Sequence, residues 1–152
     1  MNSIFKFAFA LVALLAMVSC SEKISDSDFL NVTPNNISGS WRLESSCGEP
    51  LAEGLYVYID FDRKERSFEM FQNTDSFATR CITGRYFIYT DYEAGAVIRG
   101  DYDYGNGAWE HRYVVTDLTK SRMTWTALDN EEFVNVYVRC EIPELIRAAS
   151  TK

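Results

Sequence analysis

The sequence is poor in proline, histidine and positive charge, and each shortage argues against a class of protein. Three prolines in 152 residues do not support a proline-rich stalk, and 15 basic against 22 acidic side chains give a net charge of −7. Nucleic-acid binding depends on Lys and Arg neutralising phosphates, so no nucleic-acid partner is expected. A single histidine and the lack of any Cys-x-x-Cys spacing argue against zinc, and we predict no metal and no cofactor.

Hydrophobic and aromatic side chains are plentiful. They make up 47% and 14% of the chain, respectively, and the length suits one domain with its own core. Aromatic residues favour pleated, half-buried strands, so the composition points to a β protein.

The longest apolar run, Phe7 to Val18, follows the basic residue Lys6. As a helix it would span only ~18 Å, against ~30 Å for a bilayer core, so residues 1–19 are predicted to be a secretory signal. The segment Ala16-Met-Val-Ser-Cys20 resembles the lipobox of bacterial lipoproteins. That resemblance implies cleavage before Cys20 and diacylation of its sulfur, and thus a membrane anchor. A plain secretory signal with an incidental cysteine is the alternative.

The next segment, residues 20–38, is polar and acidic, and we predict that it is a flexible tether. Ser21, directly after Cys20, is similar to the residues that direct lipoproteins to the outer membrane of Gram-negative bacteria. The acidic stretch beyond it resembles the surface-export signals of Bacteroidetes lipoproteins. The resemblance implies an outer-membrane location, and the periplasmic and surface faces both stay open.

From Gly39 onward apolar residues recur with a period of two, as in Leu55-Tyr-Val-Tyr-Ile-Asp-Phe-Asp62. Turn residues separate the alternating segments, and no intervening stretch has helical periodicity. Eight strands are predicted, over residues 40–47, 55–62, 66–73, 81–90, 96–103, 108–117, 121–128 and 132–140. Such an antiparallel meander buries its apolar face and loses its edges by closing into an eight-stranded up-and-down β-barrel. A two-layer sandwich is the alternative, and the tail 141–152 is expected to form a short helical turn.

Short motifs at both ends of this region carry a family resemblance. Gly39-Ser-Trp41 at the start of the first strand resembles the Gly-x-Trp of lipocalins, and Val138-Arg139 resembles the arginine that covers this tryptophan. Thr83-Gly-Arg-Tyr86 and the segment 113–118 are similar to the lipocalin-like domains of Bacteroidetes lipoproteins. The resemblance implies a lipocalin-like barrel over 39–140, in which Trp41 and Arg139 have a structural role at the closed end.

Besides Cys20 the chain contains Cys47, Cys81 and Cys140, an odd number for an oxidising compartment. Three pairings are conceivable. In an up-and-down barrel Cys47 ends the first strand and Cys81 begins the fourth, so both lie at one rim, whereas Cys140 lies at the other. A Cys47–Cys81 disulfide with a free Cys140 is therefore the prediction.

No catalytic constellation is evident, and we predict that the protein is not an enzyme. There is no Gly-x-Ser-x-Gly elbow, and Asp101 to Gly107, superficially like a calcium loop, has Arg112 where an acidic ligand is expected. His111 is expected to point into the barrel beside Trp109, either as a ligand contact or, more simply, as a hydrogen-bonded core imidazole.

The barrel interior is the remaining candidate site. The predicted ligand-binding residues are those that alternation places inside: Phe68, Met70, Tyr86, Ile88, His111, Tyr113, Met123, Trp125 and Val136. An eight-stranded barrel holds either side chains or one small ligand, and the predicted function is binding of a small apolar ligand. The alternative is a non-enzymatic accessory module that docks on a protein or glycan through outward aromatics: Tyr56, Tyr58, Phe71, Phe87, Tyr89, Tyr102 and Tyr104.

Overall fold

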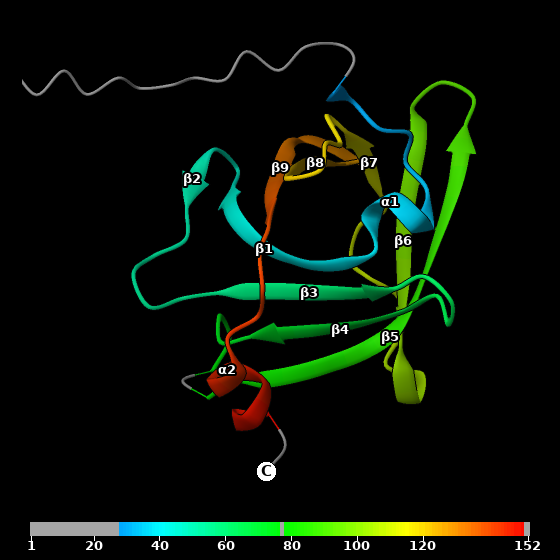
Figure 1. Cartoon of the computed structure of the whole chain (residues 1–152). Coiled ribbons are helices and arrows are strands. Elements are labelled where there is room, and N and C mark those ends of the chain that lie inside the picture. The colour runs from blue at the N-terminus through cyan, green and yellow to red at the C-terminus, as the bar shows by residue number, and fades with distance from the viewer. Residues whose placement is uncertain (1–27, 77, 151–152) are drawn as a thin grey trace, which may run out of the picture.

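Antiparallel strands occupy most of the computed structural model, which describes residues 28–76 and 78–150. Two helices and a single-turn 3-10 helix, η2, accompany them (Figure 1). In chain order the elements are α1 (Pro34–Ile37), β1 (Gly39–Ser46), β2 (Glu49–Pro50), β3 (Val57–Asp62), β4 (Ser67–Gln72), β5 (Arg80–Asp91), β6 (Gly95–Tyr102), η2 (Asp103–Gly105), β7 (Tyr113–Thr116), β8 (Arg122–Ala127), β9 (Asn130–Arg139) and α2 (Glu144–Ala149). None of the helices in this part of the chain has the length and hydrophobicity needed to cross a bilayer.

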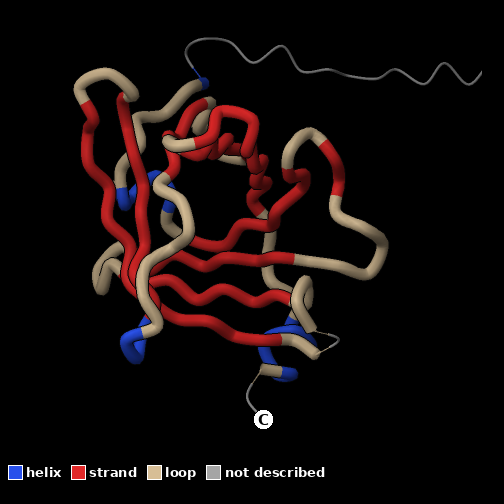
Figure 2. Tube along the Cα trace, turned by 180° about the vertical axis from the view of Figure 1, so that it is seen from behind, coloured by secondary structure: helices blue, strands red, loops and turns tan. Residues whose placement is uncertain are grey.

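The sheet closes on itself. Its order is β2-β1-β3-β4-β5-β6-β7-β8-β9, and β1 also pairs with β9, so eight strands form a ring and β2 lies outside it. Figure 2 shows the strands curling into this ring. The pairing places Trp41 opposite Arg139, with a bulge between Leu43 and Ser45. The predicted eight-stranded up-and-down, lipocalin-like barrel is confirmed, and the two-layer sandwich is excluded.

Two strand predictions need correction. The two-residue strand β2, which pairs with the end of β1 across a tight turn at Cys47 and Gly48, is not predicted. The predicted strand 108–117 is wrong over 108–112, because only Tyr113–Thr116 pairs as a strand and the residues before it form a loop. That loop carries Trp109 into the barrel, as described below.

The end of the predicted tether is part of the folded body. Thr33 caps α1 by accepting a hydrogen bond from the Asn36 amide, and Ile37 is fully buried in the core. The Leu30 amide donates to the Leu118 carbonyl at 2.7 Å, so the chain packs on the barrel from residue 30 onward. The flexible-tether prediction is therefore wrong for residues 30–38. The signal 1–19, Cys20 and residues 21–27 lie outside the described residues.

Residues from both ends of the barrel sequence close the end of the barrel that α1 covers. Trp41 is fully buried, its indole N–H donates to the Ile37 carbonyl at 2.8 Å, and the Arg139 guanidinium lies 4.1 Å from the centre of its ring. Arg139 also donates to the carbonyls of Ser38, Asn36 and Lys120. These bonds satisfy carbonyls that no strand pairs, and they tie α1 to the last strand. We call this the closed end, and the opposite end the open end.

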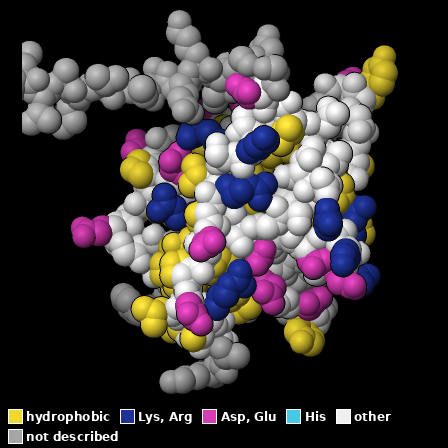
Figure 3. Space-filling model, viewed as in Figure 1, with side chains coloured by type: hydrophobic (Ala, Val, Ile, Leu, Met, Phe, Trp, Pro, Cys, Tyr) yellow, Lys and Arg dark blue, Asp and Glu magenta, His cyan; other side chains and the backbone are white. Residues whose placement is uncertain are grey.

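The C-terminal helix covers part of the outer face of the sheet. Ile142 and Ile146, flanking and within α2, pack with the outward-facing side chains of Tyr58 and Phe71, which are only 9% and 3% exposed. Arg147 forms an ion pair with Asp60 at 2.7 Å. Acidic and basic side chains interleave on this face of the molecule (Figure 3). The predicted helical turn in the tail is present, and it buries aromatic rings that were predicted to face solvent.

Candidate ligand-binding site

Stacked aromatic rings fill the middle of the barrel. The ring of Trp125 lies 5.5 Å from that of Trp109, 5.3 Å from Tyr113 and 4.7 Å from Tyr137, measured between ring centroids. Phe68 closes the group at 5.1 Å from Trp109. These centroid separations fall in the range of favourable aromatic pairs. The five rings come from four strands and one loop, and they form the floor of the open end.

Trp109 reaches this position from the loop that precedes β7. Its amide donates to the Gly100 carbonyl at 2.8 Å, and its indole lies flat against the inner face of β6. A Cβ at Gly100 would meet the indole at 2.2 Å, which no side chain tolerates. Gly100 is thus the position where the absence of a side chain admits the tryptophan.

Two buried polar atoms in this group have no hydrogen-bond partner in the described chain: Trp109 Nε1 and Asn135 Oδ1. Trp109 is 9% exposed and Asn135 is 6% exposed, and Asn135 lies directly opposite Trp125 across β8 and β9. One is a donor and the other an acceptor. Leaving such a buried group unpaired costs about 1–3 kcal/mol, so native structures rarely retain one without a function for it.

Three tyrosines of the aromatic cluster carry further polar groups. Tyr102, Tyr113 and Tyr137 influence one another electrostatically, and none forms a hydrogen bond within the described residues. Burial, with smaller contributions from Tyr102, Glu110 and Asp129, raises the pKa of Tyr113 to about 12. Burial raises the pKa of Tyr137 as well. Because the phenols are neutral at physiological pH, they offer hydrogen bonds rather than charge.

The rim of the open end carries the only histidine. His111 Nδ1 lies 2.9 Å from Asp129 Oδ1, and the imidazole packs against Tyr113 and Phe133 at centroid distances of 5.9 and 4.9 Å. This hydrogen bond lowers the pKa of Asp129. His111 is therefore held at the mouth, with 16% of its side chain exposed, rather than deep beside Trp109 as predicted. No group of three metal-ligating side chains gathers in the described part of the molecule.

The other predicted ligand residues lie as follows. Phe68, Tyr86, Met123 and Trp125 are at most 2% exposed within the core, and Met70, Ile88 and Tyr113 pack against it with partial exposure. The prediction for Val136 is wrong: on β9 the inward side chains are Asn135 and Tyr137, which pair across from Trp125 and Met123.

Sequence reasoning missed Asn135, Tyr137 and Tyr102 as inward residues, although a signal for two of them was present. An arginine that covers the inward Trp41 must share its face of the strand with residues two and four positions earlier. Arg139 therefore places Tyr137 and Asn135 inside, whereas the apolar character of the valines between them favoured the opposite face. The prediction that Tyr102 faces outward is wrong, because Tyr102 packs against the core and its ring lies 6.2 Å from that of Phe68.

The disulfide prediction is wrong, since Cys47, Cys81 and Cys140 are all free thiols in the structure. Cys47 follows β1 and Cys81 lies near the start of β5, so β3 and β4 separate them. Three strand spacings amount to about 14 Å, beyond the roughly 7 Å that a disulfide spans between Cα atoms. Lying at the same rim does not bring two residues within bonding distance.

The outward aromatics do not form the predicted docking surface. Tyr58 and Phe71 lie under α2, Tyr56 packs beside them, and Tyr102 faces inward. Of the others, Tyr89 is half-buried, Tyr104 is 95% exposed at one end, and Phe87 is 40% exposed on the wall. Phe87 is itself covered by Arg99, 4.4 Å from its ring centre. The exposed rings are scattered, as single exposed aromatics are on most proteins.

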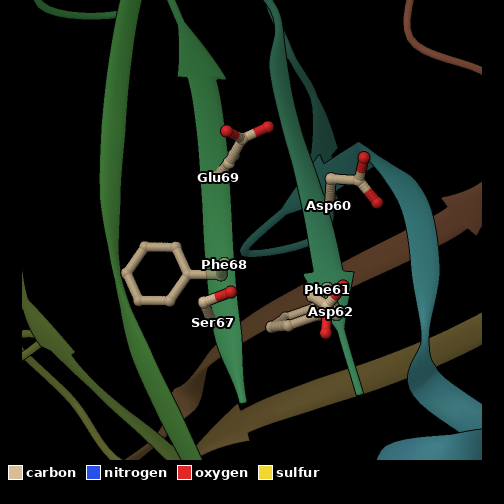
Figure 4. Close-up of a pocket in the computed structure, with 6 residues that line it drawn as sticks. All are labelled: Asp60, Phe61, Asp62, Ser67, Phe68 and Glu69. Carbon is tan, nitrogen blue, oxygen red and sulfur yellow. The ribbon is translucent and has the colours of Figure 1, made fainter. Parts of the chain in front are cut away.

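A surface pocket of about 310 Å³ lies along the β3–β4 hairpin and is lined by Asp60, Phe61, Asp62, Ser67, Phe68 and Glu69 (Figure 4). Its carboxylates already have partners within the protein. Arg147 contacts Asp60 at 2.7 Å and Glu69 at 3.7 Å, and Asp62 accepts from the amides of Lys64 and Glu65. Because its three carboxylates already have partners, the open end of the barrel is the stronger candidate site.

No known protein family, curated protein or solved structure matches the chain.

Proposed function

We propose that the protein is a lipid-anchored, lipocalin-like binding protein that holds one small, mostly apolar ligand in the open end of its barrel. The fold, the aromatic floor and the neutral phenols support an apolar site with few polar groups, which is the usual composition of a ligand pocket. In this proposal Cys20 carries the lipid and the protein performs no catalysis.

The pair of unpartnered buried atoms is the observation on which the proposal depends. A ligand that accepts a hydrogen bond from Trp109 Nε1 and donates one to Asn135 Oδ1 would recover the free energy that these two unpaired atoms cost the fold. The ligand is therefore an apolar molecule with one acceptor and one donor. The hydroxyls of Tyr102, Tyr113 and Tyr137 offer further contacts to it.

The ligand enters by displacing the loop that carries Trp109. Only two residue pairs join β6 to β7, Val97 with Val114 and Ile98 with Tyr113, and one isolated bridge joins Asp101 to Ala108. Short ladders of this kind open at low free energy. In this proposal the loop moves outward to admit the ligand and then returns, so that Trp109 Nε1 reaches the bound ligand.

Dye binding tests the proposal. N-phenylnaphthylamine, an apolar dye with one N–H donor, is expected to bind the full-length protein carrying Cys20→Ser, measured by the rise in dye fluorescence. Asn135→Leu should weaken binding by about tenfold, the value of one hydrogen bond of roughly 1.4 kcal/mol. Because Asn135→Leu removes an unpaired buried group, the variant should be at least as stable as the unchanged chain.

Val136→Thr is the matched control, since Val136 is the next residue of the same strand and faces away from the barrel interior. It should leave the dye affinity unchanged. The proposal fails if the dye does not bind, or if Asn135→Leu and Val136→Thr have the same affinity.

A further inference from the structure

The open end of the barrel has an uncompensated negative charge at its rim. Glu110 follows Trp109 directly, is exposed, and has neither an ion pair nor a hydrogen bond within the described residues. It is close enough to act electrostatically on the buried hydroxyls of both Tyr102 and Tyr113. The Glu110 carboxylate therefore lies within electrostatic range of two of the buried phenols and has no cation of its own in the described chain.

A second carboxylate adds to the negative charge of Glu110 at the rim. Asp129, 64% exposed, lies at the same rim and acts on Tyr113 as well. It also accepts the hydrogen bond of His111, whereas Glu110 has neither a hydrogen bond nor an ion pair within the described residues.

The basic side chains of the open end already have other partners. Arg112 donates to the Tyr89 hydroxyl on the outer face of β5, and Arg80 is paired with Asp75. Each loop at this end, 47–56, 73–79, 103–112 and 128–129, contains at least one acidic residue. Arg112 also lies within electrostatic range of Asp129, so Glu110 is the rim carboxylate that no cation of the described chain offsets.

The rim also presents aromatic rings that are only partly buried. Tyr113, Phe133 and His111 lie within 6.4 Å of one another by ring centroid. Aromatic faces attract organic cations through their quadrupole, and the attraction adds to that of a nearby carboxylate. The combination of aromatic rings and carboxylates suits an ammonium group that carries apolar substituents.

We propose that the ligand of this site is a cationic amphiphile, whose apolar part occupies the barrel and whose organic ammonium group lies at the rim beside Glu110. The inference rests on the proposed function and adds the charge class of the ligand. It assigns Glu110 as the residue that determines specificity, while Trp109 and Asn135 serve the buried part of the ligand.

Three amphiphiles with the same alkyl chain test the charge class: decyltrimethylammonium, decyl sulfate and decyl maltoside, each below its critical micelle concentration. The measurement is displacement of N-phenylnaphthylamine from the full-length Cys20→Ser chain. The ammonium compound should compete at least about tenfold more tightly than the sulfate, a difference of roughly 1.4 kcal/mol. Glu110→Gln should reduce that preference by about twofold to fivefold, the effect of one exposed charge pair.

Glu93→Gln is the control for Glu110→Gln, because Glu93 is exposed in the β5–β6 turn at the opposite end of the barrel. It should leave the preference unchanged. If the sulfate or the maltoside competes as tightly as the ammonium compound, or if both glutamine variants behave alike, the charge inference is wrong while the binding function stands. If the dye itself does not bind, the proposed function fails and the inference with it.

Discussion

Several residues of this protein are buried among apolar side chains and carry a hydrogen-bonding group that has no partner in the described chain. Tyr113 shows this most clearly: its ring packs against Trp125 and Trp109, while its hydroxyl has no partner in the described chain. Burial is the main reason that its pKa rises to about 12 from the usual 10. A buried phenol of this kind costs free energy when it ionises, which links the stability of the barrel to alkaline pH.

The free energy of unfolding should fall as pH rises from 10 toward 12. In that window an unfolded Tyr113 is ionised and binds fewer protons than the folded one, so the unfolded state gains stability as pH increases. Burial acts in the same direction on Tyr58, Tyr86, Tyr102 and Tyr137. Urea denaturation across this pH range measures the slope, and Tyr113→Phe should make it shallower. An unchanged slope in that variant would show that Tyr113 ionises as readily folded as unfolded.

Among the elements, α2 has the position that the sequence pattern predicts least well. The helix is short and lies beside β3, β4 and β5 (Figure 1), where it covers a strip of outward aromatics. Arg147 contributes twice, through its ion pair with Asp60 and through its position 5.5 Å from the ring of Phe71. Without the helix, Tyr58 and Phe71 would form an exposed apolar strip on the sheet.

Ile142→Ala should lower the free energy of unfolding by about 2 kcal/mol or more, because Ile142 is 7% exposed and anchors the tail over Tyr58 and Phe71. Leu145→Ala on the same tail is the control: Leu145 is 85% exposed, and its loss should change stability by less than about 0.5 kcal/mol. Chemical denaturation followed by tryptophan fluorescence compares them. Equal effects would mean that the tail does not stabilise the barrel.

At the scale of the whole molecule, the closed and open ends have different tasks. The N-terminal chain joins the barrel at the closed end, where Leu30 bonds to Leu118 and Arg139 covers Trp41. The candidate site lies at the other end. A protein tethered by its N-terminus would thus present the mouth at the end of the barrel opposite to the point of attachment.

Cys20→Ser should move the protein from the membrane fraction to the soluble fraction of fractionated cells, because the serine hydroxyl is not acylated by the thioether chemistry that modifies a lipobox cysteine. Two or three acyl chains anchor stably, at about 0.8 kcal/mol per buried methylene, so the shift should be nearly complete. Cys140→Ser, at a partly buried position near Tyr58, is the control and should stay with the membrane. A Cys20→Ser protein that remains in the membrane fraction would refute the anchor.

Much of the fold follows from local pattern. Period-two alternation predicts all eight barrel strands, and the resemblance of the Trp41 and Arg139 motifs to lipocalins predicts which strands close the ring. The residues of the candidate site are predicted less completely than the fold. Alternation correctly predicts Phe68, Tyr86, Met123 and Trp125 inside, but on the last strand it predicts Val136 inside, whereas Asn135 and Tyr137 are the buried residues.

The alternation, the turns and the charge balance follow from the order of the amino acids, since they depend on neighbouring residues and on backbone geometry. Three features appear only in the folded barrel: Trp109 enters it over Gly100, Asn135 is buried without a partner in the described chain, and α2 covers Tyr58 and Phe71. Each of these depends on contacts between segments far apart in the chain, or on a loop whose path no local preference sets. Their free energies come from packing and desolvation, which exist only once the barrel has closed.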